Sequence, residues 1–344
     1  MWEGISTGLS TVLVPTNLLL VAGGCIAGTF IGMLPGLGPI SAIALMIPIT
    51  YGFDPASGMI LMAGVYYGAI FGGSTSSILV NAPGVAGTVA TSFDGYPMAM
   101  QGKAGKALAI AAVASFAGGT IAAVLLMVAA PALAQVSLSF QSPDYLMLMI
   151  LGLTAVSAFA SRGAVLQALI ATVIGLMLST VGTDPSAGIQ RFTFGSLDLV
   201  DGISFLLLAM ATFALSEALM SVLRRSGDAQ DSLREAGEQI GSLKIEREEI
   251  REMVPTVGRS SVAGFFIGVL PGAGATIASF LAYGMERALA PMKEKLKFGH
   301  GSIRGLAAPE TANNAACTGS FVPLLTLGIP GSGTTAVMLG ALIS

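Results

Sequence analysis

Charged residues are scarce in this chain of 344 residues, where they make up only 10% of the sequence. Soluble domains carry about 25% charged residues, and a water-soluble globule of this size could not cover its surface with so few. Hydrophobic residues make up 53%. The composition therefore excludes a soluble enzyme, a disordered chain and a basic nucleic-acid-binding protein. It predicts an all-α polytopic membrane protein that contacts the lipid bilayer and no nucleic acid.

Basic residues are absent from the first part of the chain, since none precedes Lys103. The N-terminal segment accordingly lacks the basic region of a cleavable signal peptide. Twelve of the 16 Lys and Arg residues lie between Arg224 and Arg304. Because Lys and Arg mark cytoplasmic loops, we expect a charged, partly helical connector at 224–259 on the cytoplasmic side.

Cysteine and histidine are also rare, with two residues of the first kind and one of the second. Cys25 and Cys317 lie alone in apolar sequence, so neither a disulfide nor a cysteine metal site is expected. No histidine in an apolar stretch could act as a base, and no Walker A loop is present to hydrolyse ATP. We expect a protein that is not an enzyme and has no cofactor. Its energy would come from an ion gradient or a separate partner.

Apolar stretches near or above the roughly 20 residues of a membrane span recur along the whole chain. They fall at about 17–53, 56–93, 104–135, 143–160, 163–183, 199–223, 260–286 and 305–344. When the connector is placed inside, the alternation of these spans puts 15 of the 16 basic residues in the cytoplasm.

An internal repeat is visible within these stretches. Residues 28–42 read GTFIGMLPGLGPISA and residues 264–278 read GFFIGVLPGAGATIA, with nine of fifteen positions identical. A second proline-glycine break follows each copy, at Asn81-Ala82-Pro83-Gly84 and at Gly328-Ile329-Pro330-Gly331. An odd number of spans separates the two copies. The repeat is therefore expected to have inverted topology, as in many secondary transporters.

The first break of each copy predicts a re-entrant hairpin. Arg259 and Arg287 flank the stretch 260–286, so both of its ends are expected in the cytoplasm, with Leu270-Pro271-Gly272 at its turn. The alternative is a single long, tilted span with a proline kink.

These features divide the chain into three parts. Residues 1–223 form the first repeat, with a re-entrant hairpin at about 17–53, a broken helix at about 56–93 and further spans to 223. The cytoplasmic connector follows at 224–259, and residues 260–344 begin the second repeat. The later spans of the first repeat have no counterpart in the second, so we expect the second repeat to be truncated at its C-terminal end.

The proline-glycine breaks are the expected binding site. Irregular backbone in hydrocarbon is tolerated only where it is buried in protein or lines a cavity. Amides at half-helix N-termini suit a carboxylate, and unwound carbonyls suit Na⁺. The expected substrate-binding residues are Gly36, Gly38, Ser74, Thr75, Ser76, Ser77, Asn81, Pro83, Gly84, Gly272, Gly274, Pro330, Gly331, Ser332, Gly333 and Thr334. Na⁺ is expected at backbone carbonyls near Gly36, Gly272, Asn313 and Asn314.

Two simpler interpretations stay open. Gly, Ser and Thr also permit close packing of helices in lipid, which would account for much of the surplus of 45 glycines without a binding site. Glu310, in the polar run Glu310-Thr311-Ala312-Asn313-Asn314, could be a solvated acid at the start of a helix.

Several long segments resemble the large membrane subunit of the tripartite tricarboxylate transporters. They are GTFIGMLPGLGP, YYGAIFGGSTSSILVNAPG, TSFDGYPMAMQGKAGKAL, TDPSAGIQRFTFGSLDLVDG and RGLAAPETANNAACTGSFVPLLTLGIPGSGTTAVMLGAL. The resemblance extends over nearly the whole chain.

The resemblance implies a multi-pass importer of the bacterial inner membrane. It further implies two partners, a small four-span membrane subunit and a periplasmic solute-binding protein. Citrate-like dicarboxylates or tricarboxylates would be the substrates, taken up by symport with Na⁺ or H⁺, and an elevator-type movement would suit such a repeat. The alternatives are a membrane scaffold that only docks a binding protein, or a carboxylate channel.

Overall fold

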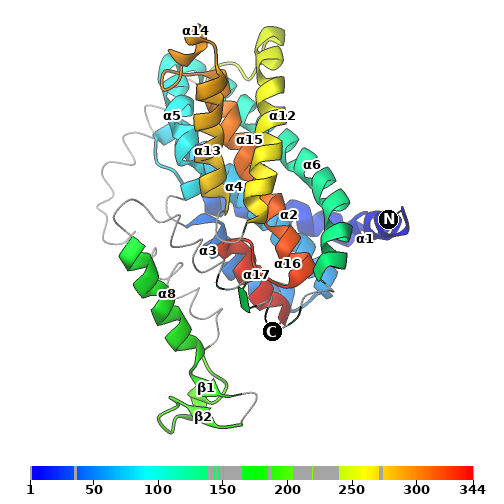
Figure 1. Cartoon of the computed structure of the whole chain (residues 1–344). Coiled ribbons are helices and arrows are strands. Elements are labelled where there is room, and N and C mark those ends of the chain that lie inside the picture. The colour runs from blue at the N-terminus through cyan, green and yellow to red at the C-terminus, as the bar shows by residue number, and fades with distance from the viewer. Residues whose placement is uncertain are drawn as a thin grey trace.

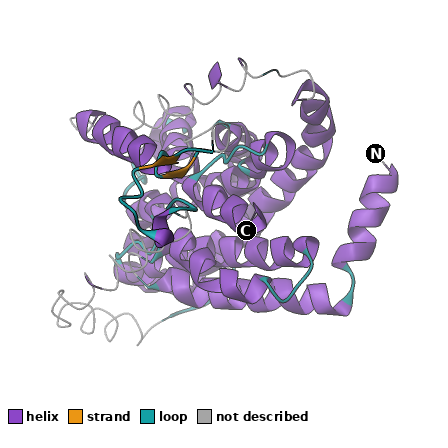
Figure 2. Ribbon diagram, turned by 90° about the horizontal axis from the view of Figure 1, so that it is seen from below, coloured by secondary structure: helices purple, strands orange, loops and turns teal. Residues whose placement is uncertain are grey.

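The computed structural model describes residues 2–34, 37–137, 165–184, 188–203, 240–270 and 274–343, with single positions at 141, 143, 146, 147, 150 and 219. This part of the chain is almost entirely helical (Figure 1, Figure 2). Its strands are a single short antiparallel pair, β1 with β2. The expected all-α class is confirmed.

The helices follow one another in two groups. The first group comprises α1 (Trp2–Val12), α2 (Pro15–Met33), α3 (Gly38–Thr50), α4 (Pro55–Val80), η1 (Ala86–Thr88), α5 (Val89–Met98), the π-helical turn η2 (Ala99–Lys103) and α6 (Ala104–Ser137). After it come α8 (Val165–Ser179), β1 (Gly182–Thr183), β2 (Gln190–Arg191) and η3 (Leu197–Leu199). The second group comprises α12 (Arg247–Val269), α13 (Gly274–Leu289), α14 (Met292–Lys295), α15 (Ile303–Gly319), α16 (Phe321–Leu327) and α17 (Gly333–Ile343).

Three described helical segments are long and apolar enough to cross a membrane. They are Pro15–Met33, Pro55–Val80 and the run Ala86–Ala132, which has a kink at Gly102 (φ 74°). The first two contain the expected hairpin arm and most of the expected broken helix. The expected spans at 143–160 and 199–223 fall largely on residues outside the described part of the chain.

Helices α2 and α4 pack with their backbones almost in contact. A Cβ built on Gly28 of α2 would lie 2.2 Å from the carbonyl oxygen of Val65 on α4. In return, a Cβ built on Gly68 of α4 would lie 2.1 Å from the carbonyl oxygen of Cys25 on α2. Glycines spaced by four residues line one face of each helix, which is the small-residue pattern that lets helices associate closely in lipid.

Helices α12 and α15 repeat this arrangement in the second group. A Cβ built on Gly264 would lie 2.5 Å from the carbonyl oxygen of Ala312, and one built on Gly268 would lie 2.3 Å from that of Ala316. The facing residues of α15 are these two alanines and Gly319, where an added Cβ would lie 2.3 Å from the Phe265 carbonyl oxygen. The packing of α2 on α4 therefore has a counterpart in α12 on α15.

The two hairpins break at the same residue of the repeated motif. Helix α2 ends at Leu34 (φ −77°, ψ 117°) and α12 ends at Leu270 (φ −75°, ψ 122°). The next helix starts in each case at a glycine with positive φ, Gly38 (56°) or Gly274 (59°). Only glycine adopts this conformation without strain, which explains why both copies keep it.

The charged connector continues directly into the second hairpin. A capping box between Glu246 and Glu249 begins α12, with the Glu249 carboxylate accepting from the Glu246 amide at 2.7 Å. The helix then runs without interruption to Val269. The first arm of this hairpin is thus longer than the apolar stretch starting at residue 260 indicates, because a helix does not need to end where its sequence becomes polar.

The turn before α6, the start of α12 and the loop before α15 lie close to one another. Lys106 of α6 forms an ion pair of 2.7 Å with Glu249 of α12, and the Gln101 side chain donates to the His300 carbonyl at 2.9 Å. Partial burial raises the pKa of the Glu249 carboxyl, but the hydrogen bonds from Lys106 and from the Glu246 amide outweigh it, and this pKa lies below its usual value. Lys106 is therefore in contact with the described C-terminal part of the expected connector.

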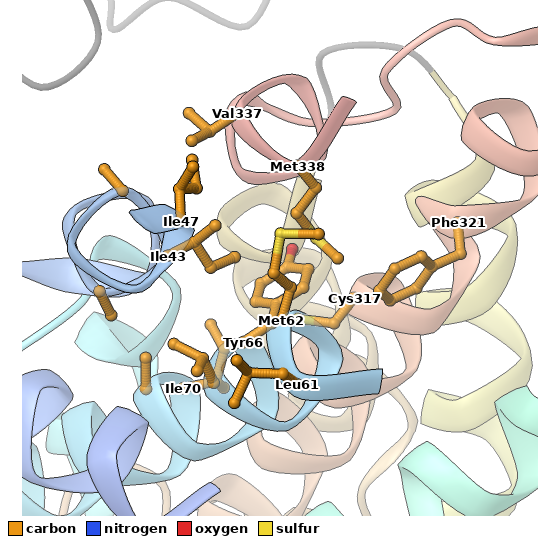
Figure 3. Packing of buried hydrophobic residues seen from close by; sticks show 14 of the residues in the cluster. Ile43, Ile47, Leu61, Met62, Tyr66, Ile70, Cys317, Phe321, Val337 and Met338 are labelled. Atoms are coloured by element: carbon orange, nitrogen blue, oxygen red, sulfur yellow. The ribbon is translucent and has the colours of Figure 1, made fainter. Parts of the chain in front are cut away.

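The largest apolar core joins the two groups of helices. Ile43 and Ile47 of α3, with Met62 and Tyr66 of α4, meet residues near the end of the chain (Figure 3). The partners from the second group are Cys317, Phe321, Leu324, Val337 and Met338. The two copies of the motif therefore belong to one packed body.

The close approach of α2 and α4 leads to a prediction about two glycines of the same helix. Gly28→Ala should lower the stability by about 1–3 kcal/mol, the usual cost of overpacking, because its Cβ would overlap the Val65 carbonyl. Gly23→Ala is the matched control, since its Cβ would meet nothing within 4 Å. Thermal unfolding of the purified protein in detergent measures both. Equal melting temperatures for the two variants would contradict the packing described for α2.

Candidate functional site

Four breaks in the helices meet in one place. The first hairpin touches both later breaks: a Cβ built on Gly38 would lie 3.9 Å from Cγ1 of Val85, and one built on Gly333 would lie 3.1 Å from Cδ1 of Ile40. The second of these contacts crosses between the two copies of the motif, because Ile40 follows the first break and Gly333 follows the last.

The second hairpin makes the same kinds of contact. A Cβ built on Gly274 would lie 3.8 Å from Cβ of Ser332, and one built on Gly87 would lie 3.4 Å from Cβ of Ala275. Helix α13 accordingly packs on η1, while α17 packs on α3. Each hairpin therefore lies against its own later break and against that of the other copy.

The two later breaks share their backbone conformation. Asn81 ends α4 and Gly328 ends α16, both in the left-handed region (φ 52° and 66°). Gly84 and Gly331 then pass close to the preceding helix: their added Cβ atoms would lie 2.9 Å from Cα of Gly73 and 2.8 Å from Cα of Ser320. All three pairs have the same separation along the sequence. The matched positions found in the sequence are thus matched in local structure.

A threonine closes each of these turns. The Thr88 hydroxyl donates to the Val85 carbonyl at 2.9 Å, and the Thr335 hydroxyl donates to the Ser332 carbonyl at 2.9 Å. The Ser332 hydroxyl in turn accepts from the Thr335 amide at 3.3 Å, which caps α17. These bonds fix the chain where each new helix starts.

The site is built from helix ends. Helices α3, α13 and α17 start here, at Gly38, Gly274 and Gly333, and η1 starts at Ala86. The first turns of a helix carry unpaired amides and a partial positive charge, which favour an anion. The C-terminal ends of α2, α4, α12 and α16 lie at the same breaks, and their free carbonyls favour a cation.

The expected residues fall into two sets. The set at the breaks comprises Gly38, Asn81, Pro83, Gly84, Gly274, Pro330, Gly331, Ser332, Gly333 and Thr334. Gly36 and Gly272, expected at the hairpin turns and near Na⁺, lie outside the described residues. The breaks therefore bring together glycines and prolines that lie far apart in the sequence, such as Gly38 and Gly333.

The expected hydroxyls of α4 lie inside that helix and not in its break. Ser76 and Ser77 donate to the Gly73 carbonyl at 3.1 Å and 2.8 Å, and Thr75 donates to the Phe71 carbonyl at 3.1 Å. Ser77 also reaches Thr88 at 2.9 Å. These hydroxyls brace the helix and the turn that follows it, whereas Ser74 points to Glu310.

The two asparagines expected near Na⁺ are buried in α15 and bonded. The Asn314 amide group donates to the Asn313 side-chain oxygen at 2.7 Å and to the Glu310 carbonyl at 3.1 Å. The Asn313 amide group points to the Gly87 carbonyl at 3.5 Å. Asn313 therefore links the second copy to the break of the first.

Two tyrosines near the breaks were not predicted from the sequence. The buried Tyr66 hydroxyl interacts with Ser320 and Ser332 of the second copy, and Tyr67 is hydrogen-bonded to Thr318. At the spacing that relates Asn81 to Gly328, these tyrosines correspond to Asn313 and Asn314. Aligning the two copies through α4 and α15 would have revealed them, since both copies send a polar side chain across to the other.

Glu310 is not a solvated acid at a helix start. It lies in the middle of α15 with no exposed surface. Its carboxyl group is hydrogen-bonded by Ser74, Thr91 and Ser115, which come from α4, α5 and α6. Because the hydroxyls come from three separate helices, no local sequence pattern predicts that they surround Glu310.

The left-handed conformation of Asn81 can be tested against its counterpart. Asn81→Gly should keep the stability of the protein, because Gly328 adopts this conformation at the matched position. Asn81→Ala should lose about 1–2 kcal/mol, the cost of left-handed backbone for a residue with an ordinary Cβ. Thermal unfolding compares the two variants, and a stable Asn81→Ala protein would show that the turn is not held in this conformation.

A family model described as the tripartite tricarboxylate transporter TctA family matches residues 18–344. The chain is 45% identical over 342 residues to an uncharacterized 52.8 kDa protein in the TAR-I ttuC' 3' region of Agrobacterium vitis. It is 52% identical over 80 residues to an uncharacterized protein in the TAR-II ttuC' 3' region of the same organism.

The extent of these matches differs. The first covers 99% of this chain and 66% of the relative, so the chain spans about two thirds of that protein's length. The second covers 23% of this chain and 32% of the relative. No solved structure matches. Because the family model covers nearly the whole sequence, the chain belongs to the tripartite tricarboxylate transporter TctA family.

Proposed function

We propose that this membrane protein imports citrate-like dicarboxylates or tricarboxylates across the bacterial inner membrane, and that the four converging helix breaks bind the carboxylate. The observation that carries the proposal is that four helices start at the breaks. Their amides provide donors and partial positive charge for an anion. Family membership supports the transport role.

The proposed site binds its anion without a salt bridge. No Lys or Arg occurs at the described residues of the four breaks, at 34 and 37–40, 81–88, 270 and 274–276, and 328–335. Full positive charges would hold a multiply charged substrate tightly, whereas helix ends, hydroxyls and the Asn81 side chain hold it weakly enough to release it. Side-chain and backbone donors to a charged group each contribute about 1.5–3 kcal/mol.

The remaining parts of the proposal come from the family. A periplasmic solute-binding protein would deliver the carboxylate, and a small four-span membrane subunit would complete the transporter. Uptake would be symport with Na⁺ or H⁺. The matched local structure of the two copies supports inverted-topology repeats and an elevator-type movement, because both copies would carry the substrate by the same kind of break.

Transport in proteoliposomes tests the site. We expect labelled citrate to accumulate when the protein is reconstituted with its two partner subunits and an inward ion gradient is imposed. Asn81→Gly should lower uptake at least about tenfold, because it removes one donor to a charged ligand while keeping the backbone conformation. Replacing Pro83-Gly84 or Pro330-Gly331 should abolish uptake in protein that still inserts.

Gly23→Ala is the control, since it lies on α2 away from the breaks and meets nothing within 4 Å. Unchanged uptake by Asn81→Gly and by both proline-glycine variants would refute the site. A scaffold is distinguished by thermal unfolding of the subunit alone: a scaffold should show no stabilisation by citrate with Na⁺, and an importer should. A channel would show flux that neither saturates nor depends on the ion gradient.

A further inference from the structure

Three acidic side chains are fully buried in the described part of the chain: Asp94, Glu286 and Glu310. The first two have strong partners. Asp94 accepts from the amides of Gly299, Gly301 and Ser302 at 2.7–2.9 Å. Glu286 accepts from the Arg259 guanidinium at 2.7 Å and 2.8 Å.

Glu310 is different, because only neutral side chains surround its carboxyl group. Ser74 lies 2.8 Å from both carboxyl oxygens, Ser115 lies 2.9 Å from Oε2, and Thr91 is bonded to Oε1. Asn313 is the remaining polar neighbour. Within the described part of the chain, no backbone amide and no basic side chain is bonded to this carboxyl group.

Two other helices that pack on α15 turn small neutral residues toward it. Helix α13 presents Ala278 and Ala282 to α15, and α12 presents Gly264. The Arg259 side chain of α12 pairs with Glu286 of α13. Arg304, on the first turn of α15 itself, lies 3.8 Å from Glu252.

A lone carboxylate in such a place is costly. Burying an ionised group without a partner costs several kcal/mol even after the protein relaxes. Hydroxyl donors reduce this cost but leave the negative charge in place. A cation bound to the carboxyl group neutralises that charge. Acidic residues inside membranes commonly mark ion and proton pathways.

We propose that Glu310, with Ser74, Thr91 and Ser115, is a binding site for one monovalent cation, a proton or Na⁺. A proton would be bound to one Glu310 oxygen, and the resulting carboxylic acid O–H would donate a hydrogen bond to the Ser74 hydroxyl. The Ser74 hydroxyl would then donate to the Ile70 carbonyl, which lies 3.2 Å away. Na⁺ would be held by the carboxylate and the hydroxyl oxygens. The shared chemistry is one positive charge on one buried carboxylate.

The location links this cation to the helix breaks. Thr91 follows the break at Asn81–Gly84 by less than ten residues, and Asn313, one turn beyond Glu310, points to the Gly87 carbonyl. At the spacing that relates the two copies, the counterpart of Glu310 is Ala63. The described part of the first copy therefore has no carboxyl group at this position. If the proposed transport function holds, binding here couples the cation to movement of the breaks.

Infrared spectroscopy of the purified protein tests the cation site without transport. If the cation is a proton, the wild type at neutral pH should show the carbonyl band of a protonated carboxyl group, and Glu310→Gln should lose it. Asp94→Asn is the matched control, because it removes the other buried acid without a basic partner and should leave the band.

Sodium binding is tested in a second experiment. The melting temperature is compared in NaCl and in choline chloride at the same ionic strength. If the cation is Na⁺, the wild type should melt at a higher temperature in NaCl, Glu310→Gln should lose the shift, and Ser115→Ala should reduce it. A wild type with neither the band nor the shift overturns the proposal. So does a band or shift that survives in Glu310→Gln.

A transport measurement then tests the cation site at Glu310 separately from the proposed carboxylate transport. Glu310→Gln should still exchange labelled carboxylate across the membrane at equilibrium but lose gradient-driven accumulation. Accumulation equal to that of the wild type would overturn the cation site while leaving the transport function intact. A wild type that takes up no carboxylate, but keeps the infrared band or the sodium shift, would refute the function and leave the cation site standing.

Discussion

A peptide group that leaves a helix inside a membrane must find its partners in protein, because the hydrocarbon offers none. The structure depends on this constraint. Each of the two later breaks passes so close to the helix before it that only glycine fits, at Gly84 against Gly73 and at Gly331 against Ser320. Glycines also bring α2 and α4, and α12 and α15, to backbone contact. Close packing by small residues and the presence of irregular backbone are therefore two parts of one solution.

The solution is used twice with the same geometry. Leu34 and Leu270 end their helices with nearly the same dihedral angles, and Asn81 and Gly328 are both left-handed. Because each hairpin touches the later break of both copies, neither copy completes the site alone. The same helix-ending residues occur at matched positions in both copies, and they bring the N-terminal ends of helices from both copies together. These N-terminal ends favour the binding of an anion.

The differences between the copies are as informative as the likeness. At the positions of Tyr66 and Tyr67 the second copy has Asn313 and Asn314, and at the position of Ala63 it has Glu310. The backbone of the site is shared, whereas the buried polar chemistry is concentrated on α15. The proposed anion site at the breaks thus rests on features that both copies share, whereas the proposed cation site rests on a carboxyl group of the second copy that has no counterpart at Ala63.

The sequence by itself determined the class and the breaks. Scarcity of charge requires a membrane protein, and Pro-Gly at matched positions ends helices wherever it occurs, because proline and glycine act through their own backbone. Only the tertiary structure decided which side chains meet. Ser76 and Ser77 were expected to bind substrate but bond to their own helix, and Glu310 is enclosed by hydroxyls from three other helices. Such contacts join residues about 200 positions apart, and packing, not local pattern, brings them together.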